Sequence, residues 1–125
     1  MIKIDKCCEV CGCNTVELHH VVKRSTATYM SNIKVNFKFL CPDHHRGNSS
    51  PHMNREIDLR YKLELQEKLF FMFSEKEYWT EKEIMDKLEC SKNEVKKITK
   101  KMFIAKEGYE VNELVKRLMG NRLYG

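Results

Sequence analysis

Two short motifs in the first half of the chain have the spacing of zinc ligands. Cys8 and Cys11 form a Cys-x2-Cys pair, and Cys41 and His44 form a Cys-x2-His pair about 30 residues later. Each pair can bring two ligands to one metal. Thiolates bind zinc tightly, and binding adds folding free energy to a small domain. The sequence therefore predicts a structural, tetrahedral Cys3His zinc site.

The remaining cysteines leave part of this prediction open. Cys7 and Cys13 lie beside the first pair at less usual spacings, so either could take part in the site. The alternative is that all of these residues are free thiols in a reduced interior, which two pairs at knuckle spacing argue against. Cys90 lies far along the chain and is expected to be a small core residue.

Further histidines form a second group in the same region. His19 and His20 are neighbours in a predicted strand, where successive side chains point to opposite faces. One of them can then bind a metal while the other faces a substrate. His45 follows a predicted zinc ligand and should be held rigidly, and His52 comes soon after. Three imidazoles can hold one divalent cation and leave positions open for a phosphate oxygen and a water.

A histidine outside such a metal site suits general-base catalysis, because its usual pKa lies near neutral pH. Asn36 could orient that base through a hydrogen bond. The alternative is that these histidines are additional zinc ligands or polar surface residues. For His52 the two interpretations are equally favoured.

Roughly the first 70 residues resemble the HNH endonuclease family. The resemblance rests on the ordered strings Cys8-x2-Cys11-Gly12, Glu17-Leu18-His19-His20-Val21 and Asn36-Phe37-x2-Leu40-Cys41-x2-His44-His45. The segment from His44 to Leu59 is similar to small HNH proteins encoded by bacteriophages and prophages. The resemblance implies a ββα-metal fold, which in many members carries a cysteine-based structural zinc.

The resemblance also implies roles for individual residues. His19 and His45 would bind the catalytic cation, His20 would deprotonate water, and Asn36 would position that base. Many members place a further ligand four residues after the closing histidine, and here that residue is Ser49. His52 is the candidate replacement, although Pro51 argues against one uninterrupted helix through His45 and His52.

The activity implied is single-metal hydrolysis of DNA phosphodiester bonds, with magnesium, manganese, nickel or zinc as the cation. Two other functions stay open. One is a non-catalytic, zinc-containing regulator that binds DNA, and the other is cleavage of RNA or branched DNA. A scaffold has no need of His20 and Asn36, which favours the nuclease.

Local patterns predict the elements that position these residues. Residues 17–22 and 37–40 read as strands, with a polar loop over 23–35. Residues 54–73 read as a long helix with Asn54 as its N-cap, because apolar residues recur at helical spacing. We expect an HNH domain over 1–73 and a smaller all-helical domain over 74–125, which makes the fold α+β.

The second half resembles a helix-turn-helix. Capping boxes at Thr80-x2-Glu83 and Ser91-x2-Glu94 open two helices, with Glu89 where a turn glycine is usual, and a last helix is expected over 112–119. The second helix of the pair would face DNA phosphates through its lysines. These are Lys92, Lys96, Lys97, Lys100 and Lys101. The alternative is a solvated helix in a small bundle.

Composition limits the other classes of function. The chain has 125 residues and a net charge of +5, which is compatible with nucleic acid as a partner. No apolar run approaches the ~20 residues of a membrane span, and the N-terminus lacks the apolar core of a signal peptide. We therefore expect a cytoplasmic protein with no membrane partner, and leave its oligomeric state open.

Overall fold

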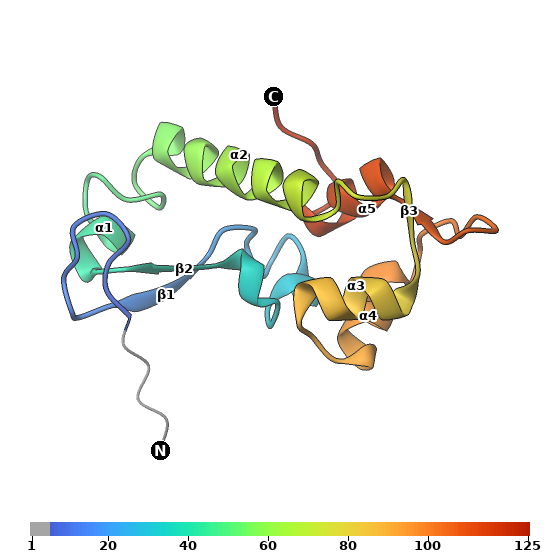
Figure 1. Ribbon diagram of the computed structural model, residues 1–125. Helices are drawn as coiled ribbons and strands as arrows, with labels where there is room; N and C mark the ends of the chain where they lie inside the picture. Colours follow the sequence, from blue (N-terminus) through green and yellow to red (C-terminus); the bar gives the residue numbers. More distant parts are fainter. Residues whose placement is uncertain (1–5) are drawn as a thin grey trace, which may run out of the picture.

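The computed structural model describes residues 6–125 and has an α+β fold (Figure 1). In the described residues it contains two two-stranded antiparallel sheets, five α-helices and two short 3₁₀ helices. In chain order these are β1 (Glu17–His20), η1 (Thr28–Met30), η2 (Lys34–Asn36), β2 (Phe37–Leu40), α1 (Pro42–Arg46), α2 (Arg55–Met72), β3 (Tyr78–Trp79), α3 (Glu81–Leu88), α4 (Lys92–Thr99), β4 (Tyr109–Glu110) and α5 (Val111–Leu118). No helix within residues 6–125 has both the length and the apolar character of a membrane span.

The first sheet pairs β1 with β2, and α1 follows directly. Its register places His19 opposite Lys38 and His20 opposite Phe37. The strand predicted over 17–22 is two residues too long. Beyond His20, the backbone N–H groups of Val21 and Val22 bond to Asn36. The Asn36 carbonyl accepts from Val21 N at 3.0 Å, and its side chain accepts from Val22 N at 2.7 Å.

Helix α2 confirms the helix predicted over 54–73. The Asn54 side chain accepts hydrogen bonds from the backbone of Glu56 and Ile57, as an N-cap should. Tyr61, Leu65 and Leu69 form its buried face. Figure 1 shows α2 running from the end of the molecule that holds α1 toward the end that holds α5. The helix therefore supports both halves of the chain.

Helices α3 and α4 form the predicted pair. Thr80 and Glu83 make a reciprocal capping box, and Ser91 accepts from the backbone N–H of Glu94. Helix α5 begins one residue earlier than the predicted Asn112, because Glu110 caps it. The Glu110 carboxylate accepts from the backbone of Asn112 and Glu113.

The turn between α3 and α4 holds Glu89 in the left-handed conformation, with φ 54° and ψ 47°. Glycine adopts this conformation without steric cost, whereas other residues lose roughly 1 kcal/mol or more. We expect Glu89→Gly to raise the free energy of unfolding by about 0.5–1 kcal/mol in urea titrations. Lys96→Gly is the matched control. Glycine at an exposed position inside a helix should lower the free energy of unfolding by about 0.5–1 kcal/mol. A destabilised Glu89→Gly variant would contradict the expectation.

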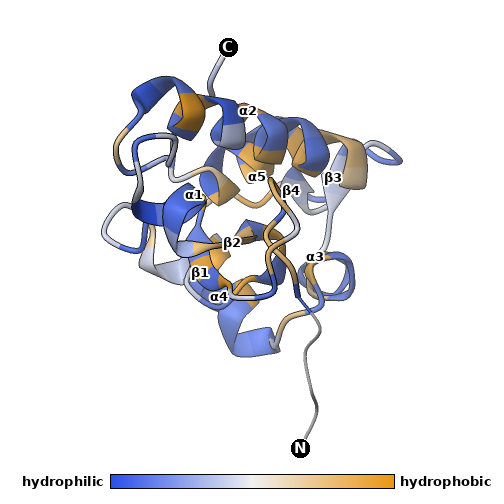
Figure 2. Cartoon of the chain, turned by 90° about the vertical axis from the view of Figure 1, so that its left-hand side faces the viewer, coloured by the Kyte–Doolittle hydropathy of each residue, from blue (hydrophilic) through white to orange (hydrophobic). Residues whose placement is uncertain are grey.

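The buried residues form one continuous core that includes both halves of the chain. Figure 2 shows apolar segments gathered between α2, α4 and α5, with hydrophilic residues on the outer surfaces. Phe73, where the predicted first domain ends, is itself fully buried and stacks edge-to-face on Trp79 with centroids 5.0 Å apart. Residues 6–73 and 74–125 thus pack against each other through their apolar faces.

Arg117 on α5 joins the two halves. Its guanidinium carbon lies 3.7 Å from the centroid of the Tyr29 ring, and the Tyr29 hydroxyl donates to Arg117 O at 2.6 Å. The guanidinium donates to Ile98 O at 2.6 Å and to Lys97 O at 3.3 Å. These carbonyls belong to the last turn of α4, where intrahelical donors are missing. Arg117 therefore caps α4 and fixes it against η1.

We expect Arg117→Ala to lower the free energy of unfolding by about 2–3 kcal/mol, because charged hydrogen bonds and a cation–π contact are lost together. Arg117→Lys should recover less than half of this loss, since an ammonium group cannot reproduce the planar fork. Lys116→Ala, at the exposed neighbouring position, should change stability by less than about 0.5 kcal/mol. Equal stability of the Arg117→Ala and Lys116→Ala variants would show that this contact contributes nothing.

Candidate metal centres

Cys8, Cys11, Cys41 and His44 lie together, with all ligand atoms within 4.8 Å of one another. Cys11 Sγ and Cys41 Sγ are 3.8 Å apart, and His44 Nδ1 lies 3.5 Å from Cys8 Sγ and 3.3 Å from Cys41 Sγ. A tetrahedral zinc with ordinary bond lengths separates two sulfurs by about 3.8 Å, and sulfur from nitrogen by about 3.5 Å. The cluster could therefore hold a metal such as zinc.

Local backbone structure holds these ligands in place. The first pair lies in a tight loop where Gly12 has φ +79° and donates to Cys8 O at 2.8 Å. Cys41 is the N-cap residue of α1, and His44 lies one turn further along. Burial raises the pKa of Cys8, but backbone N–H groups outweigh it and lower the pKa to about 6. Cys8 is thus a thiolate at neutral pH, the form that binds metals.

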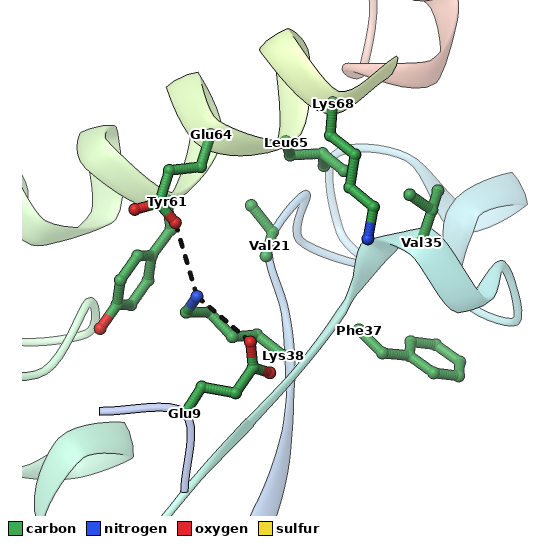
Figure 3. Close-up of a pocket in the computed structure, with 9 residues that line it drawn as sticks. All are labelled: Glu9, Val21, Val35, Phe37, Lys38, Tyr61, Glu64, Leu65 and Lys68. Atoms are coloured by element: carbon green, nitrogen blue, oxygen red, sulfur yellow. Dashed lines mark ion pairs between the residues drawn. The ribbon is translucent and has the colours of Figure 1, made fainter. Parts of the chain in front are cut away.

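Figure 3 shows how the cysteine loop is tied to α2 through Lys38 of β2. The Lys38 ammonium lies 3.5 Å from a carboxylate oxygen of Glu9 and 3.5 Å from one of Glu64. It also lies 4.3 Å from the centroid of the Tyr61 ring. Glu9 in turn accepts from the backbone N–H of Phe39 at 2.7 Å. The loop that carries Cys8 and Cys11 is therefore fixed to both β2 and α2.

The other cysteines lie outside this cluster. Cys7 and Cys13 are exposed, and neither is among the four grouped ligands. Cys90 is half-buried against the core, and burial raises the pKa of its thiol. Cys90 thus packs as the sequence predicts.

His19, His45 and His52 form a second cluster, with ligand atoms within 4.8 Å of one another. The Nε2 atoms of His45 and His52 are 3.1 Å apart, close to the roughly 3.3 Å that separates two imidazole nitrogens on one tetrahedral zinc. His52 lies in a turn between α1 and α2, and α1 already ends at Arg46, so no single helix runs through His45 and His52, as expected. Ser49 is exposed and lies outside the cluster.

The buried nitrogen of His19 lacks a partner. His19 is 2% exposed, and its Nε2 makes no hydrogen bond to any described residue. Such orphaned polar atoms are costly and rare, unless a ligand satisfies them. Burial, with added repulsion from His45 and His52, lowers the pKa of His19 to about 4. Burial likewise lowers the pKa of His52. Both imidazoles are therefore neutral at pH 7, with lone pairs for a cation.

Glu17 completes this cluster, although sequence reasoning assigned it no role. Its Oε1 accepts from His45 Nδ1 at 2.8 Å, and its Oε2 accepts from Arg46 Nη2 at 2.6 Å. The bond from His45 holds the pKa of Glu17 below its usual range. Because His45 Nδ1 carries the proton, its Nε2 is free for a metal. The available signal was strand alternation, which puts Glu17 and His19 on one face of β1.

We expect Glu17→Gln to weaken cation binding at the histidine cluster by about 10- to 100-fold, because a carboxylate orients His45 and raises its basicity. Isothermal titration with manganese or nickel on protein with a filled Cys3His site measures this loss. Glu64→Gln is the control, since that carboxylate lies beside Lys38 instead. Equal affinities of the two variants would contradict the role of Glu17.

The sequence suggests a hydrogen bond between Asn36 and His20, but each residue bonds to other partners. His20 Nε2 lies 2.9 Å from the carbonyl oxygen of Ser31. A carbonyl only accepts, so Nε2 carries the proton and Nδ1 keeps a lone pair. Asn36 is fully buried and donates instead to Val22 O at 3.0 Å and Met30 O at 3.2 Å. Asn36 therefore acts on His20 indirectly, by holding the loop that presents Ser31.

His19 and His20 both line one pocket of about 470 Å³, although the sequence predicts opposite faces for them. His45 and His52 also line this pocket, together with the cationic Lys23 and Arg24. The arrangement combines a cluster of three candidate metal ligands, a further imidazole and positive charge in one open cavity.

The predicted DNA-binding lysines lie in the other half of the chain. Lys92, Lys96, Lys97, Lys100 and Lys101 are all exposed on α4 and the turn after it. Lys97 also lies 3.9 Å from Glu94.

Comparisons with protein families, with curated proteins and with solved structures found no match for this chain.

Proposed function

We propose that this protein is a metal-dependent endonuclease of the HNH type that hydrolyses DNA phosphodiester bonds. The observation that carries the proposal is the buried, unpartnered Nε2 of His19, grouped with His45 and His52 in the pocket that His20 also lines. A purely structural cluster would not need a second imidazole with a free nitrogen in the same pocket. The Cys3His cluster would hold structural zinc a few residues away.

The ββα-metal arrangement is part of this proposal. It is supported by the order of β1, β2 and α1 and by the residues each contributes. β1 carries His19 and His20, and α1 carries both His44 and His45. Consecutive residues of one helix thereby belong to different metal clusters. Filling the Cys3His cluster would fix α1 and so set the position of His45.

His19, His45 and His52 would hold the cation, with magnesium, manganese, nickel and zinc as candidates. Nitrogen ligands favour the transition metals over magnesium. A bound divalent cation would supply electrostatic stabilisation for the charge that develops on phosphate oxygens and on the leaving oxygen. Lys23 and Arg24 would draw the DNA backbone to the pocket.

His20 would act as the general base. Its Nδ1 takes a proton from a water molecule, whose oxygen then forms a bond to phosphorus as the bond to the 3′ oxygen breaks. The imidazolium that results is stabilised by its Nε2–H bond to the Ser31 carbonyl. Asn36 keeps that carbonyl in place by anchoring Met30 and Val22.

The α3–α4 pair would hold the DNA as a helix-turn-helix. Exposed lysines on α4 suit phosphate contacts, which fix position without reading sequence. The fixed packing of α4 on η1 through Arg117 and Tyr29 supports a constant geometry between this helix and the histidine pocket.

Nicking of supercoiled plasmid DNA tests the proposal. Zinc-loaded protein is assayed with magnesium, manganese, nickel or zinc added separately, and nicking that requires an added cation is expected. No nicking with any of these cations, by folded protein that still binds DNA, would overturn the nuclease and leave a DNA-binding regulator. The same protein on RNA and on branched DNA defines the substrate.

A further inference from the structure

Two large apolar side chains are exposed just after α4. Phe103 is 87% exposed and Ile104 is 57% exposed, although both are expensive to leave in water. They precede a tight turn in which Ala105 and Gly108 pair through backbone hydrogen bonds of 2.9 and 3.2 Å. Figure 1 shows this segment projecting from the body of the molecule beside α5.

Phe103 borders a pocket of about 430 Å³ between this segment and α5. Lys101 and Lys116 contribute positive charge to the pocket, and Glu113 and Asn121 contribute polar groups. Arg117 also lines it, but its guanidinium is already bonded to the end of α4. The pocket thus combines an aromatic side chain, two lysines that form no ion pair with any residue of the described part of the chain, and groups that can bond to a base edge.

Positive charge is concentrated in this part of the chain. Between Ser91 and Lys106 there are six lysines and one acidic residue, Glu94. That excess equals the net charge of the whole chain, +5, so the remaining residues are neutral overall. An exposed aromatic side chain within a lysine-rich surface is complementary to a nucleic acid strand, whose bases present apolar faces between charged phosphates.

We propose that this pocket binds an unpaired nucleotide. Phe103 stacks on its base, Lys101 and Lys116 contact the flanking phosphates, and Glu113 accepts from a base N–H group. Asn121 already accepts from Arg117 at 3.3 Å, which leaves its amide nitrogen as the donor to a base carbonyl. A duplex does not offer a base face, so the pocket selects single-stranded segments, gaps or flaps.

The chain around Asn121 also contacts the turn that follows β1. Gly120, next to Asn121, packs on Val22 and Thr26, with a Cβ at Gly120 predicted to lie 3.2 and 3.0 Å from their side chains. The same turn supplies Lys23 and Arg24 to the histidine cavity. A strand held at Phe103 would be directed along this turn toward His20. That last step rests on the proposed nuclease, whereas the binding of an unpaired nucleotide does not.

Fluorescence anisotropy with a labelled oligothymidine, alone or annealed to its complement, tests the proposal. The full chain carrying His20→Ala is used, so that binding is measured without cleavage. Phe103→Ala should weaken binding of the single strand between about fivefold and a hundredfold, as expected when one stacked base is lost. Phe103→Tyr should stay within about twofold, because it keeps an aromatic face.

Ile104→Ser is the matched control, since this neighbour is exposed but does not line the pocket. It should leave single-strand affinity within about twofold, and Phe103→Ala should change duplex affinity by less than about threefold. A single strand bound equally by the Phe103→Ala and Ile104→Ser variants would overturn the proposal, as would a wild-type preference for duplex. An oligouridine arm shows whether the pocket discriminates against RNA. Loss of nicking with retained single-strand binding would sink only the proposed nuclease.

Discussion

Removal of zinc from the Cys3His cluster is expected to unfold the N-terminal half of the protein. Zinc at sites of this type contributes about 10–16 kcal/mol of binding free energy. The total stability of a small domain is only about 5–15 kcal/mol, so the apo form cannot compensate. The cluster joins the cysteine loop to β2 and α1, and these elements carry little apolar core of their own. Loss of the β1–β2 sheet should therefore accompany chelation.

Cys41→Ser is the sharpest variant, because Cys41 is both a cluster member and the N-cap residue of α1. We expect it to lose one equivalent of zinc, released from denatured protein and measured with a chromogenic chelator, and to lose amide protection in β1 and β2 by hydrogen exchange. Cys13→Ser is the matched control, as an exposed thiol outside the cluster. Equal zinc content in the two variants would show that Cys41 is not a ligand.

His20→Ala is expected to reduce the rate of DNA nicking by about 10²- to 10⁴-fold, the usual contribution of a general base. This corresponds to about 3–5 kcal/mol of lost transition-state stabilisation. The variant should keep its fold and both metal sites, because His20 belongs to neither cluster and is only half-buried. Zinc content and thermal unfolding should thus match the wild type.

Ser49→Ala is the control for this experiment. Ser49 occupies the position where a further ligand is often found, yet it is exposed and outside the histidine cluster. Its substitution should leave nicking within about twofold. If the His20→Ala variant nicked DNA at the wild-type rate, His20 would not be the general base. Another residue of the pocket would then have to take the proton.

Local signals in the sequence were sufficient for several parts of this structure. The Cys-x2-Cys and Cys-x2-His spacings match a tight loop or one helical turn. The two ligands of each pair therefore come together independently of the surrounding structure. Asn54 and Thr80 begin helices because their side chains bond to backbone groups two or three residues away. The strand at 37–40 is bounded by an asparagine and a Cys-Pro pair, and it was predicted to the residue.

Other features depend on contacts that no local pattern reports. Strand β1 ends at His20 because Asn36, from a distant segment, bonds to Val21 and Val22. Glu17 acquires its partners, His45 and Arg46, only when α1 folds back beside β1. The hydrogen bonds of Asn36 could not be predicted for the same reason, because its buried side chain bonds to Val22 and Met30 and not to His20.

The sequence by itself determined which residues could bind metal and in which pairs they would come, because ligand chemistry and short spacing are local properties. Spacing and the family resemblance had already assigned His44 and His45 to different metal sites. Only the tertiary structure brought His52 beside His19 and His45 across a turn. It alone buried His19 Nε2 without a partner and set Phe103 in water beside a cationic pocket. Burial and long-range contacts arise from the packing of the whole chain. The residue types and spacing of a single segment do not determine them.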